Sequence, residues 1–261
     1  MKYGIPSLME FSDVESHAAF CAKHGFSFVE LNMTYPWFQA DALDPEAIRA
    51  AQEKYGVGFT IHLHDQLNPL ELCDDLRKAS ITNILRAVEL SQKLSIPRIT
   101  MHLLPGMYSS VNGTKVYIFE KCISGYLALA EEFRQLISGR INSAETAFCI
   151  ENTSGFHAYQ RQAIELLLES PCFGLTYDIG HDAKTGYADE SFVLSHQDRL
   201  RHLHMHDSTP QANHLALGEG NLDIPKYLAL AEKLDCTVVA EVKESGALVK
   251  SEAYLRAAGK W

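Results

Sequence analysis

The chain has 261 residues, a formal net charge of −10 and a hydrophobic content of 46%. This length and content allow one large core, which favours a single globular domain spanning residues 1–261. The negative charge disfavours nucleic acid as a partner, because affinity for nucleic acid depends largely on Lys and Arg contacts to phosphate. The N-terminal residues lack the apolar core of a signal peptide, and no run approaches the roughly 18 apolar residues of a membrane span. We therefore expect a cytoplasmic protein with no membrane partner.

Six cysteines are scattered along the chain without a CxxC pair, mostly in apolar or helical contexts. This pattern favours reduced, buried thiols over a disulfide framework. The cysteines are Cys21, Cys73, Cys122, Cys149, Cys172 and Cys236.

Short β-rich runs alternate with longer amphipathic runs. In the segment 118–137, for example, apolar residues recur every three or four positions, which is typical of a helix. Such alternation predicts a parallel sheet, and eight units close naturally into a (β/α)₈ TIM barrel. An open doubly wound sheet is the alternative, but no glycine-rich phosphate turn follows the first strand. The predicted strands are 2–6, 26–32, 58–64, 97–102, 147–152, 173–178, 200–206 and 237–242.

The seventh predicted strand contains the sequence RHLHMHD, in which three histidines occupy alternate positions. Because a strand turns successive side chains to opposite faces, His202, His204 and His206 share one face. Hydrogen-bonded core histidines would explain the pattern as well as metal ligands would.

Residues that can bind a metal end six consecutive predicted strands. In a barrel of this kind the loops after the carboxyl ends of the strands build the active site, so these side chains would meet at one rim. A divalent cation would remove the cost of burying several carboxylates together. Spacing alone does not choose between His62 and His64, or between His204 and His206. The full set is His62, His64, His102, Glu151, Asp178, His204, His206 and Glu241.

Seven motifs, spread over nearly the whole predicted barrel, resemble those of the xylose isomerase-like TIM barrels. That superfamily includes sugar isomerases and epimerases and also the endonuclease IV abasic-site nucleases. The motifs are IHLH (61–64), MHLLPG (101–106), IENTSG (150–155), DIGHDAKTGY (178–187), HMHDS (204–208), HLALGEGN (214–221) and AEVK (240–243).

The resemblance to the isomerase branch implies one divalent ion held by Glu151, Asp178, His204 and Glu241. An oxygen-rich set of this kind suits Mn²⁺, Mg²⁺ or Co²⁺. Glu151 and Glu241 would also serve as acid and base, moving a carbon-bound proton of the sugar through an enediolate. His181 would then hydrogen-bond a substrate hydroxyl.

The nuclease branch implies up to three Zn²⁺ ions. His62, His102 and Glu151 would hold the first, the isomerase set would hold the second, and His181 and His214 the third. The third site is incomplete, because the chain has Ala212 where that family has an aspartate.

The DNA-binding side departs further from the nuclease pattern. The loop NMTYPWFQADALDP (32–45) is aromatic and acidic where the nucleases carry arginine, and Asp65 replaces an expected tyrosine. An aspartate that faces phosphates is repulsive, so DNA contacts would have to come from elsewhere.

Four residues are candidates for contact with a sugar substrate: His181, His64, Glu30 and Trp37. Glu30 would support a sugar hydroxyl or a neighbouring metal ligand, or else form a simple strand-end salt bridge. Trp37 would form an apolar wall over a sugar ring, or else pack within its loop or against a second subunit of a homo-oligomer.

We therefore expect a metal-dependent isomerase or epimerase acting on a small sugar or sugar phosphate. The alternative is a zinc-dependent phosphodiester hydrolase of the endonuclease IV type. A lyase or dehydratase would use the same residues, whereas a noncatalytic binding barrel has little use for two glutamates on one metal. Substrate, physiological metal and oligomeric state stay open.

Overall fold

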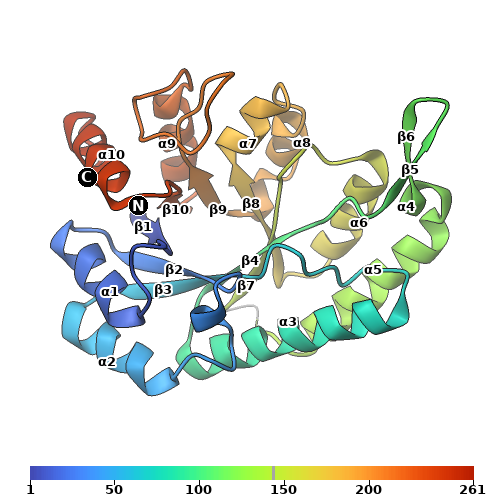
Figure 1. Ribbon diagram of the computed structural model, residues 1–261, viewed down its shortest axis with the longest axis horizontal. Helices are drawn as coiled ribbons and strands as arrows, with labels where there is room; N and C mark the ends of the chain where they lie inside the picture. The colour runs from blue at the N-terminus through green and yellow to red at the C-terminus, as the bar shows by residue number, and fades with distance from the viewer. Residues whose placement is uncertain (143–144) are drawn as a thin grey trace.

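The computed structural model describes residues 1–142 and 145–261. Eight parallel strands close into a barrel in the order β1-β10-β9-β8-β7-β4-β3-β2, with helices around the outside (Figure 1). The predicted single-domain (β/α)₈ TIM barrel is thereby confirmed. The barrel strands are β1 (Lys2–Pro6), β2 (Phe28–Asn32), β3 (Gly58–His62), β4 (Arg98–His102), β7 (Ala147–Glu151), β8 (Phe173–Asp178), β9 (Leu200–Met205) and β10 (Thr237–Ala240).

Among the described residues, four helices begin at an aspartate whose side chain caps the first turn. Asp44 accepts a hydrogen bond from the Glu46 amide at the start of α2, and Gly56 ends that helix in the left-handed region. The predicted helix 118–137 is two helices that meet at Cys122. The helices are α1 (Val14–Lys23), α2 (Pro45–Tyr55), α3 (Asp74–Leu94), α4 (Ile118–Lys121), α5 (Ile123–Ser138), α6 (Ala158–Leu168), α7 (Ile179–Lys184), α8 (Glu190–Ser195), α9 (Ile224–Lys233) and α10 (Ser245–Ala257), with 3₁₀ turns η1 (Pro36–Phe38) and η2 (Gln197–Arg199).

An antiparallel hairpin stands apart from the barrel, formed by β5 (Tyr108–Val111) and β6 (Thr114–Tyr117). It projects from the body of the molecule beside α4 (Figure 1). Asn112 and Gly113 both have positive φ, the conformation that a two-residue hairpin turn requires. The Asn-Gly pair at the tip is the sequence signal for such a hairpin.

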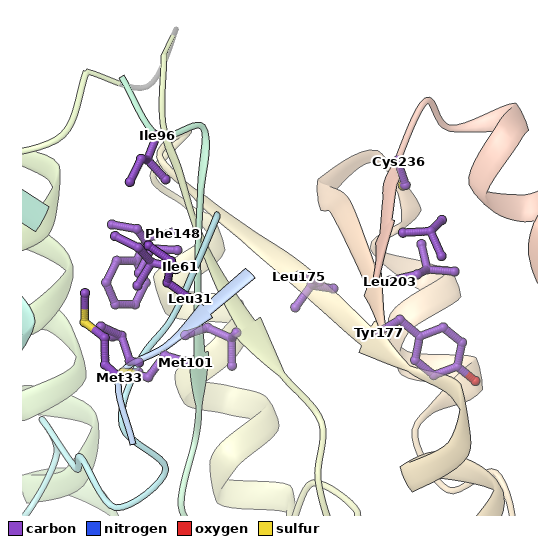
Figure 2. Close-up of a cluster of buried hydrophobic side chains, with 14 of the residues drawn as sticks. Leu31, Met33, Ile61, Ile96, Met101, Phe148, Leu175, Tyr177, Leu203 and Cys236 are labelled. Carbon is purple, nitrogen blue, oxygen red and sulfur yellow. The ribbon is translucent and has the colours of Figure 1, made fainter. Parts of the chain in front are cut away.

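Strand register separates polar from apolar side chains. On the inner face His102 pairs with Glu151, and Asp178 pairs with His204. The outer face packs aliphatic and aromatic side chains against the helices, as Figure 2 illustrates with a set of fully or almost fully buried residues. That set includes Leu31, Met33, Ile61, Ile96, Met101, Phe148, Leu175, Tyr177, Leu203 and Cys236. The strand pleat therefore points the metal-capable side chains into the barrel, and the side chains next to them in sequence pack in the core between the strands and the helices.

The two ends of the described chain lie close together (Figure 1). Tyr3 of β1 stacks on Trp261 with ring centroids 5.5 Å apart, and Phe26 meets the same indole edge-on. Among the described residues, no helix combines the length and apolar character needed to cross a bilayer.

All six cysteines are free thiols. Cys21, Cys149, Cys172 and Cys236 are buried, as expected, but Cys73 and Cys122 are exposed. The expectation of burial is wrong for these two because each lies at a helix start, on the outer surface, where one flank faces solvent.

The loop after β9 is held by one buried carboxylate. Asp207 accepts hydrogen bonds from the backbone amides of Ser208, Gly218 and Leu222, at 2.9–3.0 Å. A Cβ on Gly220 would lie 2.2 Å from Asp207 Oδ1. The glycines of the LGEGN motif thus let the backbone wrap closely around Asp207.

Candidate metal centre

Four side chains from four neighbouring strands converge at the carboxyl end of the barrel. Glu151 ends β7, Asp178 ends β8, His204 lies in β9 and Glu241 directly follows β10. One ligand atom of each lies within 4.8 Å of one ligand atom of every other. The structure therefore brings together the four residues that the resemblance to sugar isomerases selected.

His204 lies at the centre of this group. Its Nδ1 is 2.9 Å from Glu151 Oε1 and 3.3 Å from Glu241 Oε2. Burial would lower the pKa of His204, but the carboxylates around it, led by Glu151, raise it well above the usual value. Burial would likewise raise the pKa of Glu151, yet His204 and His102 hold it well below its usual range. Burial would also raise the pKa of Glu241, but His204 holds it well below its usual range, so both glutamates favour the ionised form that a cation needs.

The unpaired oxygens test whether a cation fits here. Asp178 Oδ2 and Glu241 Oε2 are buried and accept no hydrogen bond from the described residues. A buried carboxylate oxygen without a partner is costly, and a divalent cation supplies the missing charge. Three carboxylates and one imidazole form an oxygen-rich donor set that fits Mn²⁺, Mg²⁺, Co²⁺ or Zn²⁺.

Asp178 is oriented by its neighbours. Its Oδ1 accepts the His181 amide at 2.7 Å and thereby caps α7, which turns Oδ2 to the cluster. The Asn152 side chain holds the Asp178 backbone on both sides, because it donates to the carbonyl and accepts from the amide at 2.9 Å each. Asn152 was not predicted, although it directly follows Glu151 in the IENTSG motif.

A second group shares Glu151. The Nε2 atoms of His62 and His102 lie 3.0 and 3.3 Å from Glu151 Oε2. His62 Nδ1 is 2.8 Å from the Leu63 carbonyl, which fixes the proton on Nδ1 and leaves Nε2 toward the carboxylate. Asp65 Oδ1 stands 3.8 Å from His62 on the solvent side. Of the two histidines that spacing could not separate, His62 joins the cluster.

A third group contains His181, His206 and His214, each with a ligand atom within 4.8 Å of the others. His206 is fully buried, and its Nε2 lies 3.1 Å from Asp178 Oδ1. Its Nδ1 accepts the His214 amide at 3.1 Å. His214 points Nδ1 at the Glu241 carbonyl at 3.0 Å, and burial lowers its pKa to about 4. His204 and His206 thus both lie at the carboxyl end of the barrel, in different groups, and the alternation along the strand is the signal for His206.

Glu30 lies beneath the cluster, away from solvent. Its side chain is 3% exposed, and its Oε2 is 2.9 Å from His204 Nε2. His202, one pleat deeper than His204, approaches Oε1 at 3.2 Å. Glu30 is therefore not placed to contact a substrate, and it forms ion pairs with His202 and with the candidate ligand His204.

Two other predicted substrate contacts lie away from the cluster. His64 accepts the Gln66 amide at 3.1 Å and lines a separate cavity of about 290 Å³ with Arg86. Trp37 stacks on Tyr35 and lines a cavity of about 580 Å³ beside α1 and α2. The side chains turn outward there because both residues sit past the ends of their strands, where the pleat no longer fixes direction.

Exposure decreases from the rim to the floor of the site. The side chains of His102, His181, His214 and Glu241 are 14–21% exposed, whereas those of Glu151, Asp178 and His204 are fully buried. Lys243 Nζ lies 3.2 Å from Glu241 Oε1 at the mouth. A small ligand entering from solvent would meet imidazoles first and the carboxylates below them.

The family model described as xylose isomerase-like TIM barrel matches residues 18–261. The chain belongs to this family, which confirms the resemblance found in its motifs. A search of curated proteins gives no match to this sequence.

Solved structures of the same fold cover nearly the whole chain. A D-tagatose 3-epimerase-like protein shares 23% identity with a TM-score of 0.78, over 98% of this chain and 96% of that one. A 3-keto-D-glucoside 4-epimerase from E. coli shares 15% identity with a TM-score of 0.77, over 98% and 99%. A protein from Thermus thermophilus, soaked with ZnCl₂, shares 22% identity with a TM-score of 0.74, over 100% and 99%. At these identities the likeness establishes the fold.

Proposed function

We propose that the chain is a divalent-metal-dependent isomerase or epimerase that acts on a small sugar or sugar phosphate by proton transfer. The observation that carries the proposal is that Glu151 and Glu241 both approach His204 Nδ1, within a cluster that contains buried carboxylate oxygens without hydrogen bonds. Two proteins of similar fold are named as sugar epimerases or epimerase-like, which supports the same reaction class.

The cation would be held by Glu151, Asp178, His204 and Glu241. When bound, it would polarise a sugar carbonyl and so make the neighbouring carbon-bound proton more acidic. One glutamate accepts that proton as a carboxylate, and the other, which has first taken up a proton from solvent, donates it to the carbon. Because His204 lowers the pKa of both carboxyl groups, either can begin as the acceptor.

The imidazoles at the rim would orient the substrate. His181 and His102 are partly exposed and lie above the buried carboxylates. A sugar hydroxyl can donate to or accept from a neutral imidazole, so these side chains can hold a polyol in one orientation. Lys243, beside Glu241, offers the mouth of the site a positive charge.

The test combines metal content with a ketose panel. Protein stripped with a chelator and reloaded with Mn²⁺ or Zn²⁺ should interconvert one ketose pair, and in D₂O the recovered sugar should carry deuterium at the inverted carbon. Glu151→Gln and Glu241→Gln should abolish the exchange. Glu219→Gln, a change in an exposed carboxylate paired with Lys250, is the matched control and should exchange normally. Metal-loaded protein that exchanges no carbon-bound proton in any sugar contradicts the proposal.

A second candidate is a zinc-dependent phosphodiester hydrolase, favoured by the convergence of His62 and His102 on Glu151. Two cations that share one carboxylate could clamp a phosphodiester. Against it, Asp65 is 41% exposed beside these histidines and would repel a phosphate. Incision of an abasic-site duplex, with two or three zinc ions per chain, would favour the hydrolase. One ion per chain and an intact duplex would favour the isomerase.

A further inference from the structure

A buried carboxylate reaches the candidate metal-binding histidine from behind. Glu30 lies in β2, and His204 lies in β9, with β1 and β10 between these strands in the barrel. The contact of 2.9 Å between Glu30 Oε2 and His204 Nε2 therefore crosses the interior of the barrel. The Nε2–H is not aligned for a strict hydrogen bond, so the contact is chiefly one of charge.

Glu30 is itself held by neighbours from two strands. Its Oε1 accepts hydrogen bonds from Thr60 Oγ1 in β3 and from His202 Nε2 in β9, both at 3.2 Å. His202 Nδ1 in turn lies 2.6 Å from Thr237 Oγ1 in β10. These contacts fix the Glu30 carboxylate in place.

A fixed anion beside one nitrogen of an imidazole favours the proton on that nitrogen. The other nitrogen then has a lone pair available for a metal ion. A neutral ring has one N–H and one lone pair. Nδ1 hydrogen-bonds Glu151 Oε1 at 2.9 Å, in the space that the proposed cation would take. With a cation there, the Glu30 carboxylate favours the ring proton on Nε2, and Nδ1 presents its lone pair between Glu151 and Glu241. Histidine ligands in metal sites are commonly oriented in this way by a carboxylate, which also raises the basicity of the ligand.

We infer that Glu30 is a positioning residue for the proposed cation: it fixes the His204 ring so that Nδ1 is the ligand atom, with His202 and Thr60 holding Glu30 in turn. The inference rests on the proposed metal site. It explains why β9 has histidines at successive inward positions, because His202 hydrogen-bonds Glu30 and His204 would bind the cation.

A cation bound directly by Glu30, His202 and His204 is the competing interpretation, because ligand atoms of these residues also lie within 4.8 Å of one another. All three side chains are 0–3% exposed. Glu30 Oε1 already accepts two hydrogen bonds, and His202 Nε2 provides one of them. Glu30 Oε1 and both ring nitrogens of His202 are thus satisfied by hydrogen bonds, whereas Asp178 Oδ2 and Glu241 Oε2 above them are not.

The test is cation affinity, measured by competition with a chromophoric chelator for Mn²⁺ and Zn²⁺. Glu30→Gln keeps the shape of the side chain and removes its charge, and it should weaken binding about 10- to 100-fold without changing the number of ions per chain. Thr60→Val, which removes one of the hydrogen bonds to Glu30, should weaken binding less. Asp189→Asn, a buried carboxylate that holds the Phe156 amide, is the matched control and should bind as the parent does.

A second measurement reports the nitrogen directly. In zinc-loaded, ¹⁵N-histidine-labelled protein, a long-range ¹H–¹⁵N spectrum should show His204 with a protonated Nε2 and a metal-bound Nδ1. Coordination through Nε2, or equal affinity in Glu30→Gln and the parent, overturns the inference and leaves the proposed function standing. Loss of one whole ion in Glu30→Gln assigns the deep group as a cation site and also overturns it. A parent protein that binds no cation overturns the proposed function as well.

Discussion

The His206 ring lies so close to Gly180 that position 180 has no room for a side chain. A Cβ on Gly180 would lie 1.9 Å from Cε1 of the His206 ring. Gly180 lies in α7, two residues after Asp178, and His206 is fully buried and directly follows β9. The glycine thus makes room for the imidazole that lies 3.1 Å from Asp178.

Gly180→Ala should destabilise the protein by about 1–3 kcal/mol, because the buried ring cannot move away from the new methyl group. Gly125 in α5 is the matched control, since it is also helical but has nothing within 4 Å of an added Cβ. Gly125→Ala should stabilise by about 0.5–1 kcal/mol through helix propensity. Urea unfolding measures both variants, and equal stability in the two would show that His206 is not held against Gly180.

Glu151→Gln and Glu241→Gln should differ in which groups they affect. Glu151 contacts His204 through Oε1 and contacts His62 and His102 through Oε2. Among the ion pairs of the described residues, Glu241 contacts His204 but neither His62 nor His102. Glu151→Gln should therefore weaken zinc binding at both groups, and Glu241→Gln at one. If both glutamates are the acid and base, each variant should lose about 10²- to 10⁴-fold in kcat.

Isothermal titration with Zn²⁺ distinguishes the two patterns. His62→Asn isolates the second group, because His62 contacts Glu151 but not Glu241. Identical titration curves for Glu151→Gln and Glu241→Gln would mean that the chain has one cation position, not two that share Glu151.

The sequence predicts the barrel well because each strand carries its own local signal. Short β-rich runs alternate with longer amphipathic runs, and a metal-capable residue ends six consecutive predicted strands. Contacts between side chains of different strands cannot be predicted in this way. The period and spacing of residues do not show how far along the barrel axis each side chain lies. The contact between Glu30 and His204 therefore could not be predicted, and neither could the outward direction of His64. Residues past a strand end follow their loop, which is why Trp37 also departs from its expected place.

Two of the six thiols should react in the native protein. Cys73 and Cys122 are exposed, whereas the other four are buried, and burial raises the pKa of Cys21 to about 12 and that of Cys149 to about 11. A thiol reacts when reagent can reach it and when it is ionised to the thiolate. Burial and a raised pKa therefore both slow the reaction of the buried cysteines. A chromogenic thiol reagent should titrate two groups quickly and the rest only after unfolding. Fast reaction of more than two thiols would contradict the burial described here.

His17 should make the protein less stable in mild acid. Its ring is fully buried between Phe11 and Phe38, its Nε2 accepts the Leu8 amide at 2.9 Å, and its Nδ1 donates to the Asp13 carbonyl at 2.8 Å. Burial lowers the pKa of His17 below the value of about 6.5 expected for the unfolded chain, and Asp13 only partly offsets this. The unfolded state therefore takes up the proton first, so the contribution of His17 to stability is complete above about pH 6.5 and is lost as the pH falls below it.

His17→Gln tests this pH dependence, because glutamine does not titrate yet its Oε1 can accept the Leu8 amide. The variant should be less stable than the parent at neutral pH, since the ring packing is lost, but its free energy of unfolding should fall less steeply with acidification below about pH 6.5. Urea unfolding at a series of pH values gives both slopes, and groups other than His17 cancel in the comparison. An equally steep fall in parent and variant would place the acid sensitivity elsewhere, and a His17 ring that titrates at or above the unfolded value in the NMR spectrum would show that burial does not control it.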